Sequence, residues 1–267
     1  MHRIFLLKAL TLSAIFMPFQ VSAEYQESQN FKLGVERIGY HYKETSNGSM
    51  VMKATGPMIG INAAYTYEDG QDFFIDLDAR ALTGLEDYDG HLMNLDTGTR
   101  TPYSTGYNTR NHIFETRLTP GFKFEGGYHL YAGLGYRLKT DSPIYSNSAS
   151  YKRQSQYLYL PFGVKVPSKL FEIDTVPYFE YDLFLMGKQV SGATSNLGQS
   201  VNRQSNGFGL KTGVAFVIDA FELTPFIHYW HINDSDISWT QYKNGVMPMI
   251  EPENTTWEIG IKATYRF

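Results

Sequence analysis

The sequence predicts an all-β protein, a single antiparallel up-and-down β-barrel of about 10 strands, with a range of 8–12. Apolar and aromatic residues recur at every second position through most of the chain, and this period of two is typical of strands. Short and long connections alternate between these runs, as they do in a meander that goes back and forth. No linker or change of composition divides the chain, so one domain is expected.

The first half of the chain holds five expected strands. Four are regular, at 58–68, 72–82, 114–124 and 128–139. The run that precedes them, 31–43, is irregular, because its apolar residues change phase on either side of Arg37. An inserted residue would cause such a change, so we predict a β-bulge near Arg37.

The second half repeats this design. Its expected strands are 158–166, 178–185, 208–218, 223–230 and 257–267. The short connections are 69–71, 125–127 and 219–222, and 167–175 is intermediate. The longer ones are rich in Ser, Asn, Gly and Asp, and they are 44–56, 83–111, 140–155, 189–205 and 233–254. These five are predicted as loops at one end of the barrel.

The amino terminus has the three parts of a secretory signal in order. Arg3 and Lys8 are basic, 9–19 is an apolar core too short to cross a bilayer comfortably, and 21–23 is a small-residue cleavage site. We therefore expect a cleaved signal peptide at 1–23 and a barrel at 24–267.

The faces of the expected strands favour a membrane barrel over a soluble sandwich. One face is apolar and aromatic, and the other mixes small, polar and charged residues. A membrane barrel turns its apolar face to lipid and its polar face to the lumen. Aromatic residues gather at the strand ends, as interfacial girdles require, and a secretory signal precedes the strands. The sequence thus predicts a transmembrane barrel.

The last expected strand, TWEIGIKATYRF at 256–267, resembles the terminal signature of Gram-negative outer-membrane β-barrel proteins. That signature has alternating apolar residues, an aromatic residue two before the end, and a final Phe. The resemblance implies that Trp257, Tyr265 and Phe267 form an assembly signal. It also implies residence in the outer membrane, biogenesis with periplasmic chaperones and the barrel-assembly machinery, and contact with outer-membrane lipid and lipopolysaccharide.

The face expected to line the lumen carries charges of both signs. We expect a lumen charge network of Asp76, Asp78, Arg80, Glu115, Arg117, Arg137, Glu180, Asp182, Lys211, Glu258, Lys262 and Arg266. A barrel of this size has little interior space beyond its side chains, so these charges must pair. The interpretation is a salt-bridged, largely plugged lumen, and the alternative is a narrow porin-like channel for small solutes.

Several residues could carry chemistry. Asp76 and Asp78 could form a carboxylate pair, as in omptin proteases, which also have ten strands, but they lie near mid-membrane and Arg80 follows on the same face. His228 and His231, with Asp234 and Asp236 just beyond, could form a general base or a weak metal site. Three apart in a strand, the two histidines point to opposite faces and cannot share one metal without a bend, and the other interpretation is an interfacial His beside a solvated loop. The expected loop 83–111 is acidic and aromatic, and such a loop could bind divalent cations or a host surface.

Composition excludes other classes. With 0 Cys there is no disulfide scaffold, thiolate metal site or Cys nucleophile, and a net charge of −4 argues against a nucleic-acid partner. No cofactor or metal is expected, and the oligomeric state stays open. The expected function is non-enzymatic, with long extracellular loops that serve envelope structure or surface interaction. A lipid-modifying or omptin-like enzyme is a weaker alternative.

Overall fold

A computed structural model describes residues 30–267 except 95, 145–150, 195–196 and 244. The expected signal segment 1–23 lies outside the described residues. Among the residues described, no helix is long and apolar enough to cross a membrane.

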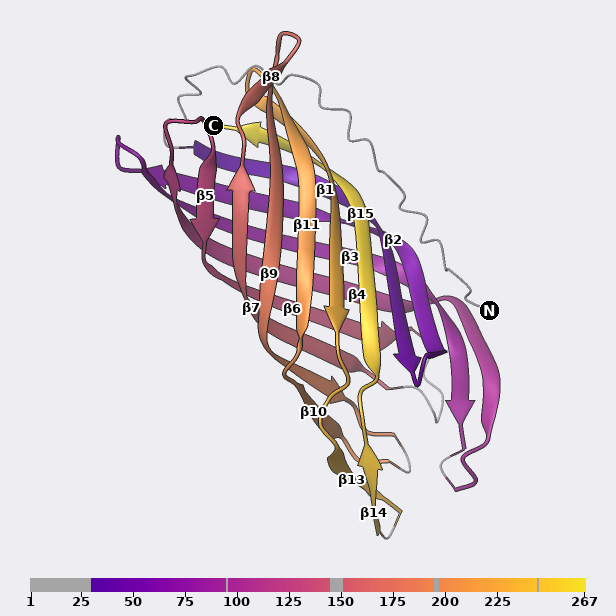
Figure 1. Cartoon of the computed structure of the whole chain (residues 1–267). Helices are drawn as coiled ribbons and strands as arrows, with labels where there is room; N and C mark the ends of the chain where they lie inside the picture. Colours follow the sequence, from indigo (N-terminus) through magenta and orange to yellow (C-terminus); the bar gives the residue numbers. More distant parts are fainter. Residues whose placement is uncertain (1–29, 95, 145–150, 195–196, 244) are drawn as a thin grey trace, which may run out of the picture.

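The strands form one closed antiparallel ring with 10 positions (Figure 1). In chain order these are β1 (Asn30–Ser46), β2 (Ser49–Glu68), β3 (Phe73–Met93), β4 (Arg100–Lys123), β5 (His129–Ala132) with β6 (Leu134–Pro143), β7 (Arg153–Lys165), β9 (Ile173–Ser191), β11 (Gly207–Ile218), β12 (Phe221–Ile232) and β15 (Glu253–Arg266). β5 and β6 share one position, because both pair with β4 and with β7. β1 pairs with β15 and closes the ring. The predicted fold class and strand number are confirmed.

The ring has two different ends. Short turns and both ends of the described chain lie at one end, which we call the turn end, and it is at the upper left of Figure 1. The opposite, hairpin end carries the longer elements. There β10 (Ser200–Gln204) pairs with β9, and β13 (Ser238–Tyr242) pairs with β14 (Gly245–Met249) as a separate hairpin. β8 (Ser168–Leu170) pairs with the first residues of β9 at the turn end.

Two of the predicted loops are wrong. Most of 44–56 and of 83–111 is strand, so that β2, β3 and β4 have 20, 21 and 24 residues and only 94–99 connects β3 to β4. Hydrogen bonds between backbone groups pair these added parts of β2, β3 and β4, and such bonds do not depend on the side chains. Their buried positions include polar side chains such as Glu44, Glu86 and Asn111, so the apolar alternation that reveals a strand is lost there.

The predicted bulge near Arg37 is also wrong. β1 keeps one register with β15 along its length and one register with β2 up to Glu44, and the shift against β2 comes between Glu44 and Thr45. Ile38 and Tyr40 point into the lumen and are almost fully buried. The apolar residues therefore change face without any change in the backbone, because the interior is itself apolar at that height.

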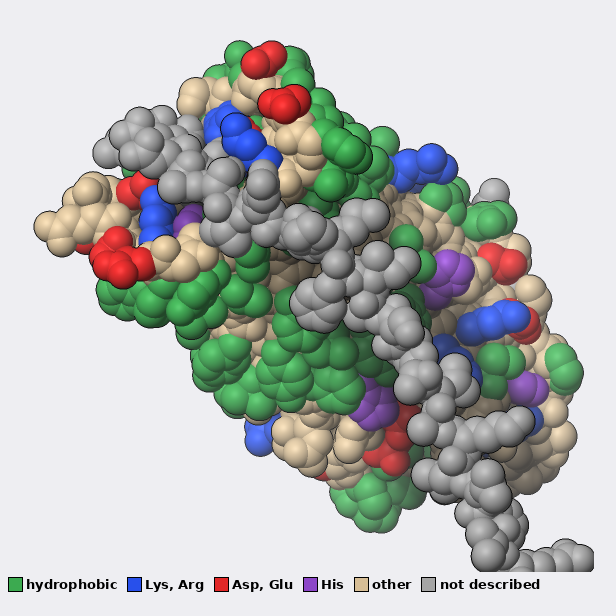
Figure 2. All heavy atoms as spheres, turned by 45° about the horizontal axis from the view of Figure 1, so that its top comes forward, with side chains coloured by type: hydrophobic (Ala, Val, Ile, Leu, Met, Phe, Trp, Pro, Cys, Tyr) green, Lys and Arg blue, Asp and Glu red, His purple; other side chains and the backbone are tan. Residues whose placement is uncertain are grey.

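The outer wall is the apolar surface of the molecule. Exposed large hydrophobic side chains recur on every strand position of the ring, and Figure 2 shows them as broad areas with smaller groups of charged side chains. Aromatic pairs such as Phe73–Phe122 and Phe221–Tyr265 lie near the turn end. The wall thus has the apolar outer face and the aromatic rim of a membrane barrel.

Candidate functional site in the lumen

A cluster of ionised side chains crosses the middle of the lumen around Arg80. Its guanidinium contacts Glu36, Glu115 and Glu258, each at 2.8 Å. These carboxylates come from β1, β4 and β15, and the arginine comes from β3. The cluster therefore ties β3 to its neighbour β4 and to β1 and β15, two and three positions away around the ring, and Arg80 is only 8% exposed.

Arg137 of β6 completes this cluster. It bonds Glu115 at 2.8 Å and also bonds Glu258, so these two carboxylates are shared between both arginines. On the other side of Glu258 lies His228, which is fully buried and has Nε2 3.0 Å from Asp182. We name Glu36, Arg80, Glu115, Arg137, Asp182, His228 and Glu258 the central cluster.

A second group of charges lies nearer the turn end. Arg117 contacts Glu180 at 2.5 Å and Asp78 at 3.2 Å, and the Tyr131 hydroxyl donates to Glu180 at 2.8 Å. Asp76 instead accepts from Lys165 at 2.5 Å. Asp76 and Asp78 therefore bind different cations, and nothing in this arrangement resembles a shared-proton pair.

Arg80 also departs from the sequence expectation. Its place on the same face as Asp76 and Asp78 favoured an ion pair within this group, but Arg80 contacts glutamates of three other strands instead. Arginine has a long side chain with a fork of donors, so it can span the axis to several carboxylates. Its neighbour Asp78 has a short side chain and takes the closer Arg117.

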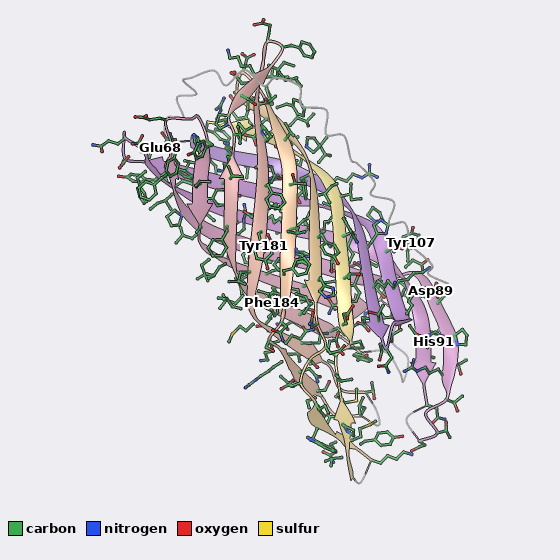
Figure 3. The ribbon with its side chains drawn as sticks, in the orientation of Figure 1. Glu68, Asp89, His91, Tyr107, Tyr181 and Phe184 are labelled. Carbon is green, nitrogen blue, oxygen red and sulfur yellow. The ribbon has the colours of Figure 1, made fainter. Side chains whose placement is uncertain are left out.

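Aromatic side chains fill the lumen on the hairpin side of the central cluster. Trp230 and Tyr159 are fully buried, with ring centroids 5.0 Å apart in an edge-on arrangement. Tyr157, Phe184 and Ile232 pack with them, and we name these five side chains the aromatic plug. The Tyr159 hydroxyl donates to Glu115 at 3.1 Å and so joins the plug to the central cluster. Phe184 lies midway along the wall in Figure 3.

A third charge group closes the lumen at the hairpin end. Arg153 of β7 contacts Glu44 at 2.5 Å and bonds Glu251, which lies between β14 and β15. The Tyr42 hydroxyl donates to Glu44 at 2.9 Å. Burial raises the pKa of the Glu251 carboxyl to about 8; nearby Arg153 opposes this shift and Glu44 reinforces it. One arginine thus faces two carboxylates, and a proton on Glu251 removes the excess negative charge.

Substitution of Glu251 by glutamine is expected to change how stability depends on pH. Because the pKa of Glu251 is raised in the folded protein, its contribution is complete below the ordinary carboxyl pKa and is lost as pH rises through about 8. Glu251→Gln mimics the protonated form, so the variant should match the native protein near pH 5 and be the more stable one at pH 9. Denaturant midpoints at both pH values measure this, and equal midpoints at pH 9 would contradict it.

The remaining expected residues occupy different places. Lys211 and Lys262 line a polar cavity of about 150 Å³ on the turn side of the central cluster. Arg266 donates to the carbonyl oxygen of Asp219 at the turn end. His231 lies on the outer face beside Phe208, opposite in direction to His228, as the strand period predicted. The expectation that His228 is interfacial is wrong, because it is completely buried against Asp182.

The proposed assembly residues point outward. Trp257 packs on Tyr229 with ring centroids 4.5 Å apart, and Phe267 packs on Tyr265 and Phe31 at the turn end. They therefore lie on the apolar wall.

The acidic segment 83–111 does not form a cation site in the described residues. Asp89 pairs with Lys53 at 3.1 Å, and Asp96 pairs with Lys243 at 2.6 Å. Figure 3 shows Asp89 and His91 on the projecting part of β3, far from Glu68 at the turn end. Within the described ranges no group of three or more His, Asp or Glu side chains could hold a metal ion.

Sequence reasoning missed part of the lumen. Glu36 was lost with the supposed bulge, and Glu44, Arg153 and Glu251 fell in segments expected to be loops. Without a bulge, the alternation that starts at Lys32 continues to Glu44 and places both Glu36 and Glu44 on the inner face. No comparable signal exists for Arg153 and Glu251, whose meeting depends on the closed ring.

Comparisons with known proteins support the fold. No protein-family model and no curated protein matches the sequence. Among solved structures, the outer membrane protease OmpT from Escherichia coli superposes with a TM-score of 0.51 at 11% identity, covering 92% of this chain and 99% of that one. The β domain of the Bordetella autotransporter BrkA gives 0.42 at 11% identity and covers 90% of this chain and 100% of that one. The neisserial surface protein NspA gives 0.33 at 14%, with 89% and 97% covered. At 11% identity the likeness to OmpT shows the fold alone.

Proposed function

We propose that this chain, which has the fold of an outer-membrane β-barrel, is a non-enzymatic barrel with a plugged lumen that presents long hairpins outside the cell. The proposal places it in the outer membrane of a Gram-negative bacterium, with the turn end in the periplasm and the hairpin end at the surface. Its partners are then outer-membrane lipid and lipopolysaccharide, with the barrel-assembly machinery and periplasmic chaperones acting during biogenesis.

The observation that carries this proposal is that three groups of packed side chains block the lumen one after another along its axis. The central cluster, the aromatic plug and the Arg153 group follow one another from mid-lumen to the hairpin end. Most of their side chains are buried, so little solvent reaches the axis between them. A solute or ion would have to break paired charges and displace packed rings, and both costs oppose conduction.

Bilayer recordings test the plug against the narrow channel. The refolded protein is expected to insert without single-channel steps, because no open path crosses the central cluster and the plug. The double variant Tyr159→Ala/Trp230→Ala removes two plug rings, and steps from it would prove that insertion and detection work. Defined, reproducible steps from the native protein would favour the narrow porin-like channel instead.

An activity test addresses the non-enzymatic part of the proposal. Asp76 and Asp78 bind different cations, Lys165 and Arg117, and do not form a carboxylate pair. The purified, refolded protein is therefore expected to turn over neither peptides nor lipid A. Turnover of either substrate, abolished by Asp76→Asn or His231→Ala, would overturn this part and restore the enzyme alternative.

A further inference from the structure

An apolar groove of about 710 Å³ crosses the outer wall over β7, β9, β11, β12 and β15. Its lining contains no charged side chain and includes Phe179, Val214, Phe216 and Ile227. The outward face of a membrane barrel contacts lipid. A groove on that face therefore offers an elongated apolar ligand a place among its side chains.

Beneath the groove the ladder between β11 and β12 is interrupted, whereas the ladder between β11 and β9 is continuous. β11 and β12 keep one register, but the ladder is interrupted between Gly213 and Phe216, at the positions of Val214 and Ala215. Pro225 of β12 and Pro177 of β9 flank this stretch, and proline has no N–H to donate.

Gly213 has no side chain, so the wall consists of backbone alone at this position. A Cβ at this position would come within 2.6 Å of the Pro225 carbonyl oxygen and 2.7 Å of the Tyr178 hydroxyl. The Tyr178 side chain thus lies against the bare backbone of Gly213. Its hydroxyl is buried and has no hydrogen-bond partner in the part of the chain that the structure describes.

The polar cavity of the lumen lies directly behind this stretch. Tyr178 lines both the groove and the cavity, and Ala215 and Thr224 of the interrupted ladder line the cavity side. Lys262 of the cavity lies over the ring of Phe226, which lines the groove, at 5.8 Å from its centroid. The two hollows are therefore separated by a single layer of side chains and backbone.

The cavity holds two ammonium groups without a carboxylate partner. Four of its cations, Lys32, Arg80, Arg117 and Lys165, each contact a carboxylate. Lys211 and Lys262 form no ion pair with any described residue, although Lys211 is only 6% exposed. An unpaired buried charge is costly, so an anion bound here would stabilise both lysines.

We propose that this part of the wall binds an anionic single-chain amphiphile, a long-chain carboxylate. The chain lies in the groove, and the carboxylate passes the interrupted ladder beside Tyr178 to Lys211 and Lys262. This site goes beyond the proposed function and is compatible with it, because the cavity lies on the turn side of the central cluster and needs no open lumen.

Photo-crosslinking of the full-length protein in phosphatidylcholine nanodiscs tests the proposal. The probes are stearate with a diazirine in mid-chain and the stearyl alcohol that carries the same diazirine. Stearate is expected to label the segment 212–218 of β11, and excess unlabelled stearate should suppress this labelling. The alcohol, which lacks the charge, should label the segment at least 10-fold less.

Matched variants separate the groove from the wall in general. Thr212 in the groove and Thr116 on β4 both donate to a backbone carbonyl of the neighbouring strand, at 2.9 and 3.0 Å. Thr212→Phe fills the groove and should lower labelling at least 10-fold, whereas Thr116→Phe should leave it unchanged. Val214→Phe serves the same purpose should Thr212→Phe fail the heat-modifiable gel shift that reports folding.

The lysine pair has its own control. Lys262→Gln should lower labelling by stearate and leave labelling by the alcohol unchanged. Lys123→Gln, which breaks the Lys123–Glu68 pair away from the cavity, should affect neither. Labelling spread evenly around the wall, or unaffected by Thr212→Phe, would overturn the groove. Equal labelling by both probes with no effect of Lys262→Gln would overturn the carboxylate site.

Discussion

Replacement of Arg80 by methionine is expected to lower the free energy of unfolding by about 3–5 kcal/mol, the cost of removing one partner from a buried ion pair. Arg80 contacts Glu36, Glu115 and Glu258; without it, Glu115 and Glu258 would keep Arg137, whereas Glu36 would lose its ion pair. The loss is larger than that of a surface pair because water and salt screen buried charges much less than exposed ones. Equilibrium unfolding in denaturant, with the protein in lipid vesicles, measures the change.

A companion substitution tests the reason for this loss. Glu36 bonds Arg80 and, in the described part of the chain, does not bond Arg137. Arg80→Met/Glu36→Gln removes one charge of each sign, so it should recover a large part of the lost stability. Lys169→Met breaks a half-exposed pair with Asp174 at 3.6 Å and should change stability by no more than about 0.5 kcal/mol. Equal effects of Arg80→Met and Lys169→Met would show that the central cluster does not stabilise the fold.

Truncation of Trp230 to alanine is expected to cost about 3–5 kcal/mol, as for other large aromatic side chains in a core. Trp230 is completely buried, and its ring lies 5.0 Å from Tyr159 and 5.9 Å from Tyr157. Backbone hydrogen bonds hold the surrounding strands in place, so the wall cannot move inward to fill the cavity that the substitution leaves. The same unfolding experiment measures the loss.

Trp239 provides the matched control for this prediction. It lies on the β13–β14 hairpin and is 69% exposed, so Trp239→Ala removes the same side chain from a site outside the lumen. Its unfolding free energy should stay within about 0.5 kcal/mol of the native value. A Trp230→Ala variant as stable as Trp239→Ala would contradict the view that the rings form a packed plug.

The sequence predicted the membrane-spanning part of the wall well and the rest poorly. Runs such as 114–124 and 208–218 alternate because one face meets an apolar surrounding and the other does not. Where β3 and β4 extend to Met93 and Arg100 that contrast ends, and the expected loop proved to be strand. At Arg37 an apolar interior produced the pattern of a bulge without the bulge.

The charged lumen residues show the same division. Alternation alone placed Asp76, Arg80 and Glu115 on one face, because side-chain direction in a strand depends only on the parity of the position. Their partners could not be read in this way. Arg80 meets Glu258, 178 residues away, only because β1 pairs with β15 and bends the sheet into a ring.

The sequence by itself determined an all-β meander with an apolar outer face, a charged inner face and a resemblance to outer-membrane barrels, because each of these depends on local order and residue type. Tertiary structure alone decided that the charges pair across the axis, that His228 is buried against Asp182, and that Tyr178 stands between a groove and a cavity. These contacts join strands distant in the chain, and their geometry is fixed only when the ring closes and sets the distance across the lumen.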